Sequence, residues 1–120
     1  MREQTSRNVK VLFVQEVENY LFKLIDILYL NNYFSYKENA VKYVIDLEKD
    51  IKTNIANKVK RRAPSYFNRY GKKLLYCTFK KSKDTHWYVF FNIYHDNSDT
   101  IFLIRYISNN HQSAKYLGIM

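Results

Sequence analysis

Three runs rich in aromatic and β-branched residues follow one another in the second half of the chain, at residues 74–79, 87–94 and 100–107. Residues of these types favour β-strands, and short polar segments separate the runs. Neither polar segment is long enough to hold a crossover helix. The pattern therefore predicts three antiparallel strands joined as a β-meander.

Side chains within each strand should alternate between the two faces of the sheet. In the second run this alternation places Trp87, Val89, Phe91 and Ile93 on one face. In the third run it places Arg105 on the same face as Ile107 and opposite Tyr106. A buried arginine needs a partner, whereas an arginine on an open face is a ready phosphate ligand. Both faces are apolar, so the pattern leaves open which one meets the helices.

The first half of the chain has the three- and four-residue apolar spacing of two amphipathic helices. The first helix is expected between about Glu16 and Asn31. The second should begin at a capping box formed by Ser35 and Glu38 and end near residues 59–62, because Pro64 disfavours helix in the residue that precedes it. A short link between them predicts an antiparallel helical hairpin.

Two terminal segments complete the expected fold. Residues 9–14 fit either a short strand or the entry to the first helix, and residues 108–117 fit a turn followed by one or two helical turns. We therefore expect one α+β domain over residues 1–120, a two-helix hairpin packed on an antiparallel β-meander, with a possible leading edge strand and a short C-terminal helix.

The formal net charge of +9 points to a polyanionic partner. Between Lys58 and Lys83 the chain carries ten lysines and arginines and no acidic residue. This stretch is either a solvated surface or the footprint of a nucleic acid or acidic peptide. Within it, residues 64–71 interleave arginine with tyrosine, a mixture that can hold phosphates and stack bases, or else pack a loop against the sheet.

Other features exclude several classes of protein. The single cysteine, Cys77, cannot form an intrachain disulfide and is expected to be a small core residue. The apolar region at residues 17–30 is interrupted by Lys23 and Asp26, and the amino terminus lacks the apolar stretch of a signal peptide. We expect a cytoplasmic protein with no membrane span. The scattered histidines and two glycines predict no metal site, no glycine-rich phosphate loop and no cofactor.

The tail of the chain brings together His111, Lys115 and Tyr116 within a short span. In a helix His111 and Lys115 would share a face, because they are four residues apart. Histidine, lysine and tyrosine can move protons or hold a phosphoryl charge without a metal. An ordinary polar surface helix is the other interpretation of this segment.

Residues 9–117 resemble the RelE/ParE family of bacterial type II toxins in the order of their expected elements. The positions that carry the resemblance are residues 36–40 (YKENA), residues 101–107 (IFLIRYI), and the ending from Asn110–His111 to Tyr116. The resemblance implies a small cytoplasmic toxin that is neutralised by a cognate antitoxin. The RelE-like branch cleaves messenger RNA in the ribosomal decoding site, whereas the ParE-like branch poisons DNA gyrase without being a nuclease.

If the resemblance to the RelE-like branch holds, it implies a metal-independent endoribonuclease whose catalytic residues are His111, Tyr116 and Arg105. His111 or Tyr116 would act as acid or base, and Lys80, Lys81 and Arg105 would stabilise the charge of the phosphorane formed when the 2′-hydroxyl attacks. His86 stands where that branch often has an arginine. The residues expected to bind RNA are Arg61, Arg62, Arg69, Lys72, Lys73, Lys80, Lys81, His86 and Lys115.

The resemblance, together with the basic stretch and the His111–Tyr116 tail, thus implies a toxin that cleaves messenger RNA on the ribosome and so inhibits translation. Two alternatives stay open. One is a ParE-like toxin that inhibits gyrase without nuclease activity, and the other is a non-toxic basic module that binds nucleic acid.

Overall fold

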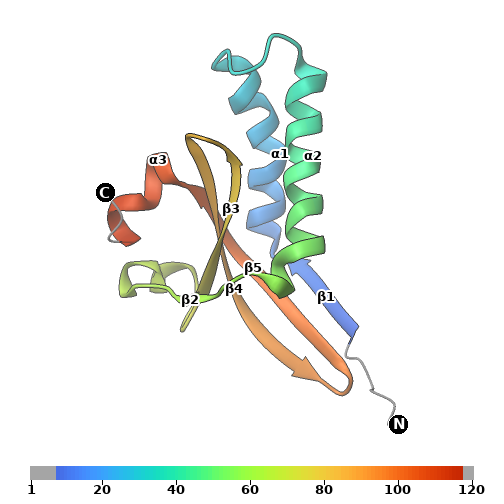
Figure 1. Ribbon diagram of the computed structural model, residues 1–120, viewed down its shortest axis with the longest axis vertical. Coiled ribbons are helices and arrows are strands. Elements are labelled where there is room, and N and C mark those ends of the chain that lie inside the picture. Colours follow the sequence, from blue (N-terminus) through green and yellow to red (C-terminus); the bar gives the residue numbers. More distant parts are fainter. Residues whose placement is uncertain (1–7, 118–120) are drawn as a thin grey trace.

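The computed structural model describes residues 8–117, apart from the side chains of Ala114 and Lys115, and shows an α+β fold (Figure 1). The helical elements are α1 (Gln15–Leu30), α2 (Lys37–Asn54), α3 (Asn110–Ser113) and the 3₁₀ helices η1 (Ile55–Asn57), η2 (Ser65–Tyr70) and η3 (Ala114–Leu117). The strands are β1 (Asn8–Phe13), β2 (Arg61–Arg62), β3 (Leu75–Ser82), β4 (Thr85–Asp96) and β5 (Asp99–Asn109). Figure 1 shows the hairpin of α1 and α2 on one side of the sheet and α3 on the other.

The sheet has five strands in the order β1-β5-β4-β3-β2. Strands β3, β4 and β5 pair antiparallel, so the predicted meander is confirmed. The leading segment is a strand, and β1 pairs parallel with β5, which makes the sheet mixed. The prediction that the second helix ends near residues 59–62 is wrong, since α2 ends at Asn54 and residues 61–62 form the short edge strand β2. Its two residues, Arg61 and Arg62, pair with Tyr76 and Leu75 of β3.

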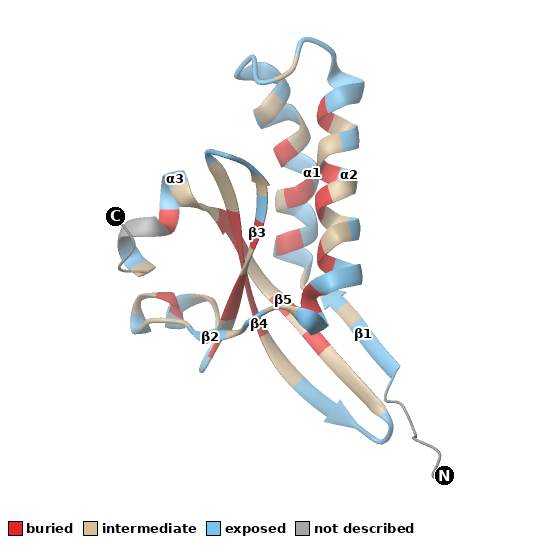
Figure 2. Cartoon of the chain, viewed as in Figure 1, coloured by how far each residue is buried: buried red, intermediate tan, exposed pale blue. Residues whose placement is uncertain are grey.

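The helix side of the sheet carries the larger of two apolar cores. From β4 it takes Trp87, Val89 and Phe91, the set that alternation had placed on one face. Figure 2 shows the buried residues of α1 and α2 along the sides on which the two helices meet each other and the sheet. Trp87 Nε1 donates a hydrogen bond of 2.9 Å to the Tyr43 hydroxyl, which ties β4 to α2. Cys77 is buried in the same core, as expected, and burial raises the pKa of its thiol to about 12.

A bulge in β5 changes the faces of the residues around Arg105. Phe90 pairs with Tyr106 while Phe91 pairs with Ile104, so Arg105 is an extra residue in β5. An extra residue shifts the alternation that follows it. Ile104 and Ile107 therefore both lie in the helix-side core, and Tyr106 packs against the core on the opposite face. The prediction that Arg105 and Ile107 share a face is wrong for this reason.

The opposite face carries a second core that is largely aromatic. Its buried members are Phe67, Leu74, Tyr76, Tyr88 and Phe90. Phe67, which comes from η2, is fully buried, and its ring stacks on that of Phe90 with centroids 4.4 Å apart. The connection between α2 and β3 is therefore packed against the sheet. Packing of this loop was one of the two interpretations of residues 64–71, the other being phosphate binding and base stacking.

The start of α2 differs from the expected capping box. The helix begins at Lys37, its N-cap residue is Tyr36, and no side chain caps its first turn. Ser35 lies one residue before the N-cap, where its hydroxyl is displaced from the orphan amides of the first turn. Among the helices within residues 8–117, none has both the length and the apolar character required to cross a membrane.

Candidate nucleic-acid interface

The basic residues expected to form one surface fall into two clusters. The first basic cluster lies at the start of β3 and comprises Arg61, Arg62, Lys72 and Lys73, all exposed. The second basic cluster comprises Lys80, Lys81 and Lys83, at the end of β3 and in the turn to β4. Arg62 of the first cluster pairs with Leu75 of β3. Leu75 is five residues before Lys80, a separation of about 16 Å along the strand. The continuous basic stretch of the sequence is thus divided by the length of β3.

Lys80 and Lys81 point to different faces of the sheet. Lys80 lies directly opposite His86 on the face away from the helices. Lys81 Nζ lies over the ring of Tyr43 in α2, 5.6 Å from its centroid, and so belongs to the helix side. Lys80 and His86 therefore share one surface, as expected for RNA-binding residues, and Lys81 does not.

Asn110 joins this end of the sheet to α3. Its Oδ1 accepts a hydrogen bond of 2.9 Å from the backbone amide of His86, and its Nδ2 donates one of 3.1 Å to the carbonyl of Asp84. These bonds fix the start of α3 beside the β3–β4 hairpin. The side chain of His111, the next residue, is exposed and lines a cavity of about 350 Å³ against the helical hairpin.

A three-layer stack joins η2 to the tail of the chain. The ring of Tyr66 lies parallel to that of Tyr116, with centroids 3.8 Å apart and an interplanar angle of 4°. Arg69 Cζ lies 4.1 Å from the Tyr66 centroid, and Arg69 Nε donates a hydrogen bond of 3.1 Å to the carbonyl of Tyr66. Since both neighbours lie within about 4 Å of one ring, they must occupy its opposite faces. We call this arrangement the Arg69–Tyr66–Tyr116 stack.

The electrostatics of the stack keep the Tyr66 hydroxyl protonated. Desolvation and a hydrogen bond with Tyr116 raise the pKa of Tyr66, and the Arg69 charge opposes them. Its phenol is therefore a neutral donor and acceptor at physiological pH. Arg69 is exposed, so a cation and an aromatic face are presented together.

The three predicted catalytic residues belong to different features. His111 lines the cavity against the helical hairpin, Tyr116 lies in the stack, and Arg105 lies at the β5 bulge. The side chain of Lys115 lies outside the part of the chain that is described. Asn92 and Asn110 were not predicted as site residues, because each contributes through a partner distant in sequence. Tyr66 lies in the segment at residues 64–71 whose tyrosines and arginine were expected either to stack bases and hold phosphates or to pack on the sheet.

Arg105 is held in position by β4. Its Nε donates a hydrogen bond of 2.6 Å to Asn92 Oδ1, and its Nη2 donates one of 3.2 Å to the Tyr94 hydroxyl. Asn92 Nδ2 in turn donates to the carbonyl of Lys72 at 3.0 Å. Both partners of Arg105 are neutral, so neither cancels the charge of the guanidinium. These two bonds therefore fix the orientation of the guanidinium without neutralising it.

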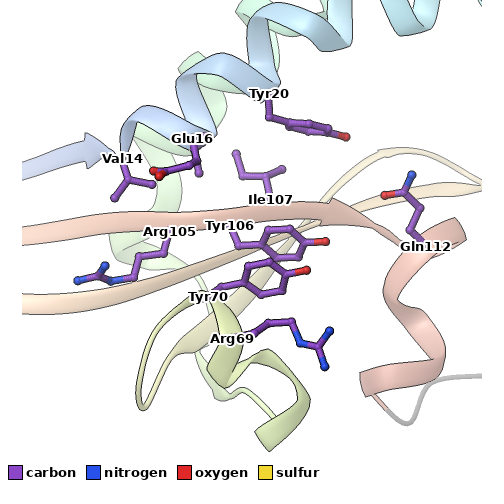
Figure 3. Close-up of a pocket in the computed structure, with 10 residues that line it drawn as sticks. Val14, Glu16, Tyr20, Arg69, Tyr70, Arg105, Tyr106, Ile107 and Gln112 are labelled. Atoms are coloured by element: carbon purple, nitrogen blue, oxygen red, sulfur yellow. The ribbon is translucent and has the colours of Figure 1, made fainter.

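A cleft of about 560 Å³ lies between α1, η2 and β5. Its lining residues are Val14, Glu16, Val17, Tyr20, Arg69, Tyr70, Arg105, Tyr106, Ile107 and Gln112. Figure 3 shows the hydroxyls of Tyr20, Tyr70 and Tyr106 directed toward the side on which Gln112 lies, and the Arg105 guanidinium directed the opposite way. The cleft therefore has a hydroxyl-rich end and an end lined by Arg105 and Glu16.

Two of these tyrosines have strongly raised pKa values. Burial, followed by the electrostatic influence of Tyr106, raises the pKa of Tyr20 to about 12. Burial and a hydrogen bond with Tyr106 also raise the pKa of Tyr70 to about 12. The Tyr70 and Tyr106 rings lie parallel, with centroids 3.7 Å apart. The phenols of Tyr20 and Tyr70 stay protonated in neutral solution, where they can donate and accept hydrogen bonds.

Gly71→Ala is expected to disturb Arg105. A Cβ at Gly71 would lie 2.6 Å from Arg105 Cδ and 3.2 Å from Leu74 Cδ2. Crowding of this kind forces side chains from their preferred rotamers, so we expect the free energy of unfolding in urea to fall by about 1–3 kcal/mol. In an Arg105→Ala background the closest clash is absent, and the same substitution should cost clearly less. An equal cost in the two backgrounds would contradict this account of Gly71.

Comparison of the chain with protein-family models, curated proteins and solved structures found no match. Within residues 8–117, no group of three or more histidine, cysteine, aspartate or glutamate side chains is arranged to hold a metal ion. The stack, the two basic clusters and the cleft are therefore the features from which a function can be proposed.

Proposed function

We propose that the protein is a RelE/ParE-like toxin of a type II toxin–antitoxin system and that it inhibits translation by acting on messenger RNA at the ribosome. The observation that carries the proposal is the Arg69–Tyr66–Tyr116 stack, which combines a guanidinium with two aromatic rings in a strongly basic segment. Proteins recognise unpaired RNA by stacking its bases on aromatic rings and guanidinium planes. The proposal includes a cytoplasmic location and a cognate antitoxin.

The basic clusters support this function because each provides a cation on the aromatic face. Arg61, which pairs with Tyr76, lies at one end of this face, and Lys80 with His86 lies at the other end. Phosphate contacts of this kind position a nucleic acid without reading its sequence. RNA crossing the face would meet cations at both ends and stacking groups from η2 and η3.

The stack also bears on the chemistry proposed for cleavage. A metal-independent ribonuclease must activate a 2′-hydroxyl, stabilise the phosphorane and protonate the leaving 5′-oxygen. Tyr116 and Arg69 both pack against the Tyr66 ring, whereas His111 lines a separate cavity. We therefore assign the proton donor to Tyr116 in preference to His111, with Arg69 as the cation that stabilises the phosphorane charge.

Gyrase inhibition is the second candidate function. The observation that favours it is the separation of His111, Tyr116 and Arg105 into three features, because a binding toxin needs no assembled catalytic group. This candidate keeps the toxin class and replaces RNA by gyrase as the target.

The test is inducible expression in a bacterial host, with growth, methionine incorporation and plasmid supercoiling followed together. We expect growth arrest in which methionine incorporation falls first and supercoiling is unchanged. A Tyr66→Leu/Arg69→Gln variant should be harmless, whereas Lys49→Gln, which removes one exposed charge from α2, should arrest growth. Relaxed plasmid with continuing protein synthesis would favour gyrase, and no arrest at a confirmed level of full-length protein would contradict a toxin.

A further inference from the structure

The cleft between α1, η2 and β5 has the composition of a site for a planar, neutral ring. Val14, Val17 and Ile107 provide apolar surface, and the Tyr70 and Tyr106 rings lie beside them (Figure 3). Its volume of about 560 Å³ is within the range of small-ligand pockets, roughly 300–1,000 Å³. A single heteroaromatic ring with its attached sugar is compatible with this volume.

The polar groups of the cleft suit the edge of such a ring. Figure 3 shows the hydroxyls of Tyr20, Tyr70 and Tyr106 pointing toward the side on which Gln112 lies. Phenols and primary amides both donate and accept hydrogen bonds. Nucleobases present alternating donors and acceptors along their Watson–Crick edges, so they match a wall that offers both.

The charges in the cleft argue against a free anion as its main occupant. Arg105 lines one end together with the carboxylate of Glu16, so that end carries both signs of charge. Arg69 lies by the hydroxyl-rich end and is exposed. A neutral ring inside the cleft would need no net charge from Arg105 and Glu16. The anionic backbone attached to that ring would lie beside the Arg69 guanidinium.

Arg69 connects the cleft to the proposed RNA surface. The same side chain lines the cleft and forms one layer of the Arg69–Tyr66–Tyr116 stack. A strand whose bases stack on the outer layers, Arg69 and Tyr116, would therefore pass the mouth of the cleft.

We propose that the cleft binds one unstacked nucleobase of a single-stranded RNA while the neighbouring bases lie on the stack. The inference rests on the proposed function, because it takes RNA as the molecule that this face binds. Tyr20, Tyr70, Tyr106 and Gln112 contact the edge of the base, and Arg69 contacts the adjoining phosphate. The cleft thus contributes a base-selective contact to an otherwise sequence-tolerant surface.

The test is photo-crosslinking of the full chain to a fluorescein-labelled hexauridylate that contains 4-thiouridine. Trypsin would separate the relevant tyrosines, because Tyr66, Tyr70, Tyr106 and Tyr116 fall in four different peptides bounded by lysine or arginine. We expect crosslinks in the peptides of Tyr70 or Tyr106, in addition to those of the stack.

Affinity measurements with the same oligonucleotide complete the test. Tyr70→Phe and Tyr106→Phe keep the rings and remove the hydroxyls, so each should weaken binding roughly three- to tenfold. Tyr36→Phe is the matched control, since Tyr36 is 66% exposed and lies outside the cleft. Binding with crosslinks confined to the stack and no effect of either variant would overturn this inference and leave the proposed function standing. Absence of RNA binding would overturn both.

Discussion

Replacement of Phe67 by alanine is expected to lower the free energy of unfolding by about 3–5 kcal/mol, the usual cost of removing a buried phenylalanine. Phe67 is fully buried beneath the connection between α2 and β3, and its ring stacks on Phe90. Its removal leaves a cavity in the smaller core and detaches η2, which carries Tyr66 and Arg69. Urea unfolding followed by circular dichroism measures the loss.

Asn68→Ala provides the matched control, because Asn68 is the exposed neighbour of Phe67 in the same 3₁₀ helix. Its substitution should change the free energy of unfolding by less than about 0.5 kcal/mol. If Phe67→Ala also cost less than about 1 kcal/mol, η2 would not be anchored to the sheet through this side chain.

Tyr66→Leu is expected to weaken binding of single-stranded RNA about ten- to hundredfold, because the Tyr66 ring holds Arg69 and Tyr116 in place as the outer layers on which bases stack, and one such stacking contact contributes about 1–3 kcal/mol. Leucine keeps an apolar contact at η2 but removes the ring between Arg69 and Tyr116. Arg69→Gln should weaken binding and also reduce the slope of log affinity against log salt by about one, as expected for one lost phosphate contact. Fluorescence anisotropy with a labelled 12-nucleotide RNA, over a range of salt concentrations, measures both effects.

Lys49→Gln removes the same charge as Arg69→Gln but from the exposed side of α2, across the sheet from η2. It should leave the affinity and the salt slope almost unchanged. Thermal unfolding of each variant separates a binding defect from a folding defect. Equal losses for Arg69→Gln and Lys49→Gln would mean that RNA responds to net charge alone and that the stack is not its site.

The sequence predicted the elements whose signals are local. Apolar spacing identified α1 and α2, and β-branched and aromatic runs separated by short turns identified the three strands of the meander. Alternation also assigned Trp87, Val89 and Phe91 to one face correctly. The choice between strand and helix for residues 9–14 could not be made in advance, because β1 acquires its hydrogen bonds from β5 at the far end of the chain.

The features that the sequence did not reveal depend on contacts between distant segments. The bulge at Arg105 is defined by the register of β5 against β4, and no local pattern of apolar residues shows it. Tyr66 and Tyr116 come together only because η2 and the tail pack on the same face. Conversely, Lys80 and Lys81 are adjacent in sequence, yet the pleat of β3 sends them to opposite faces.

The most direct test of the proposed function is primer extension on a reporter message in a reconstituted translation system, with and without ribosomes. We expect new 5′ ends within the open reading frame that require both ribosomes and the wild-type protein. These ends should be lost with Tyr66→Leu/Arg69→Gln and retained with Lys49→Gln. Message that stays intact in the presence of both ribosomes and the wild-type protein would contradict ribonuclease action at the ribosome.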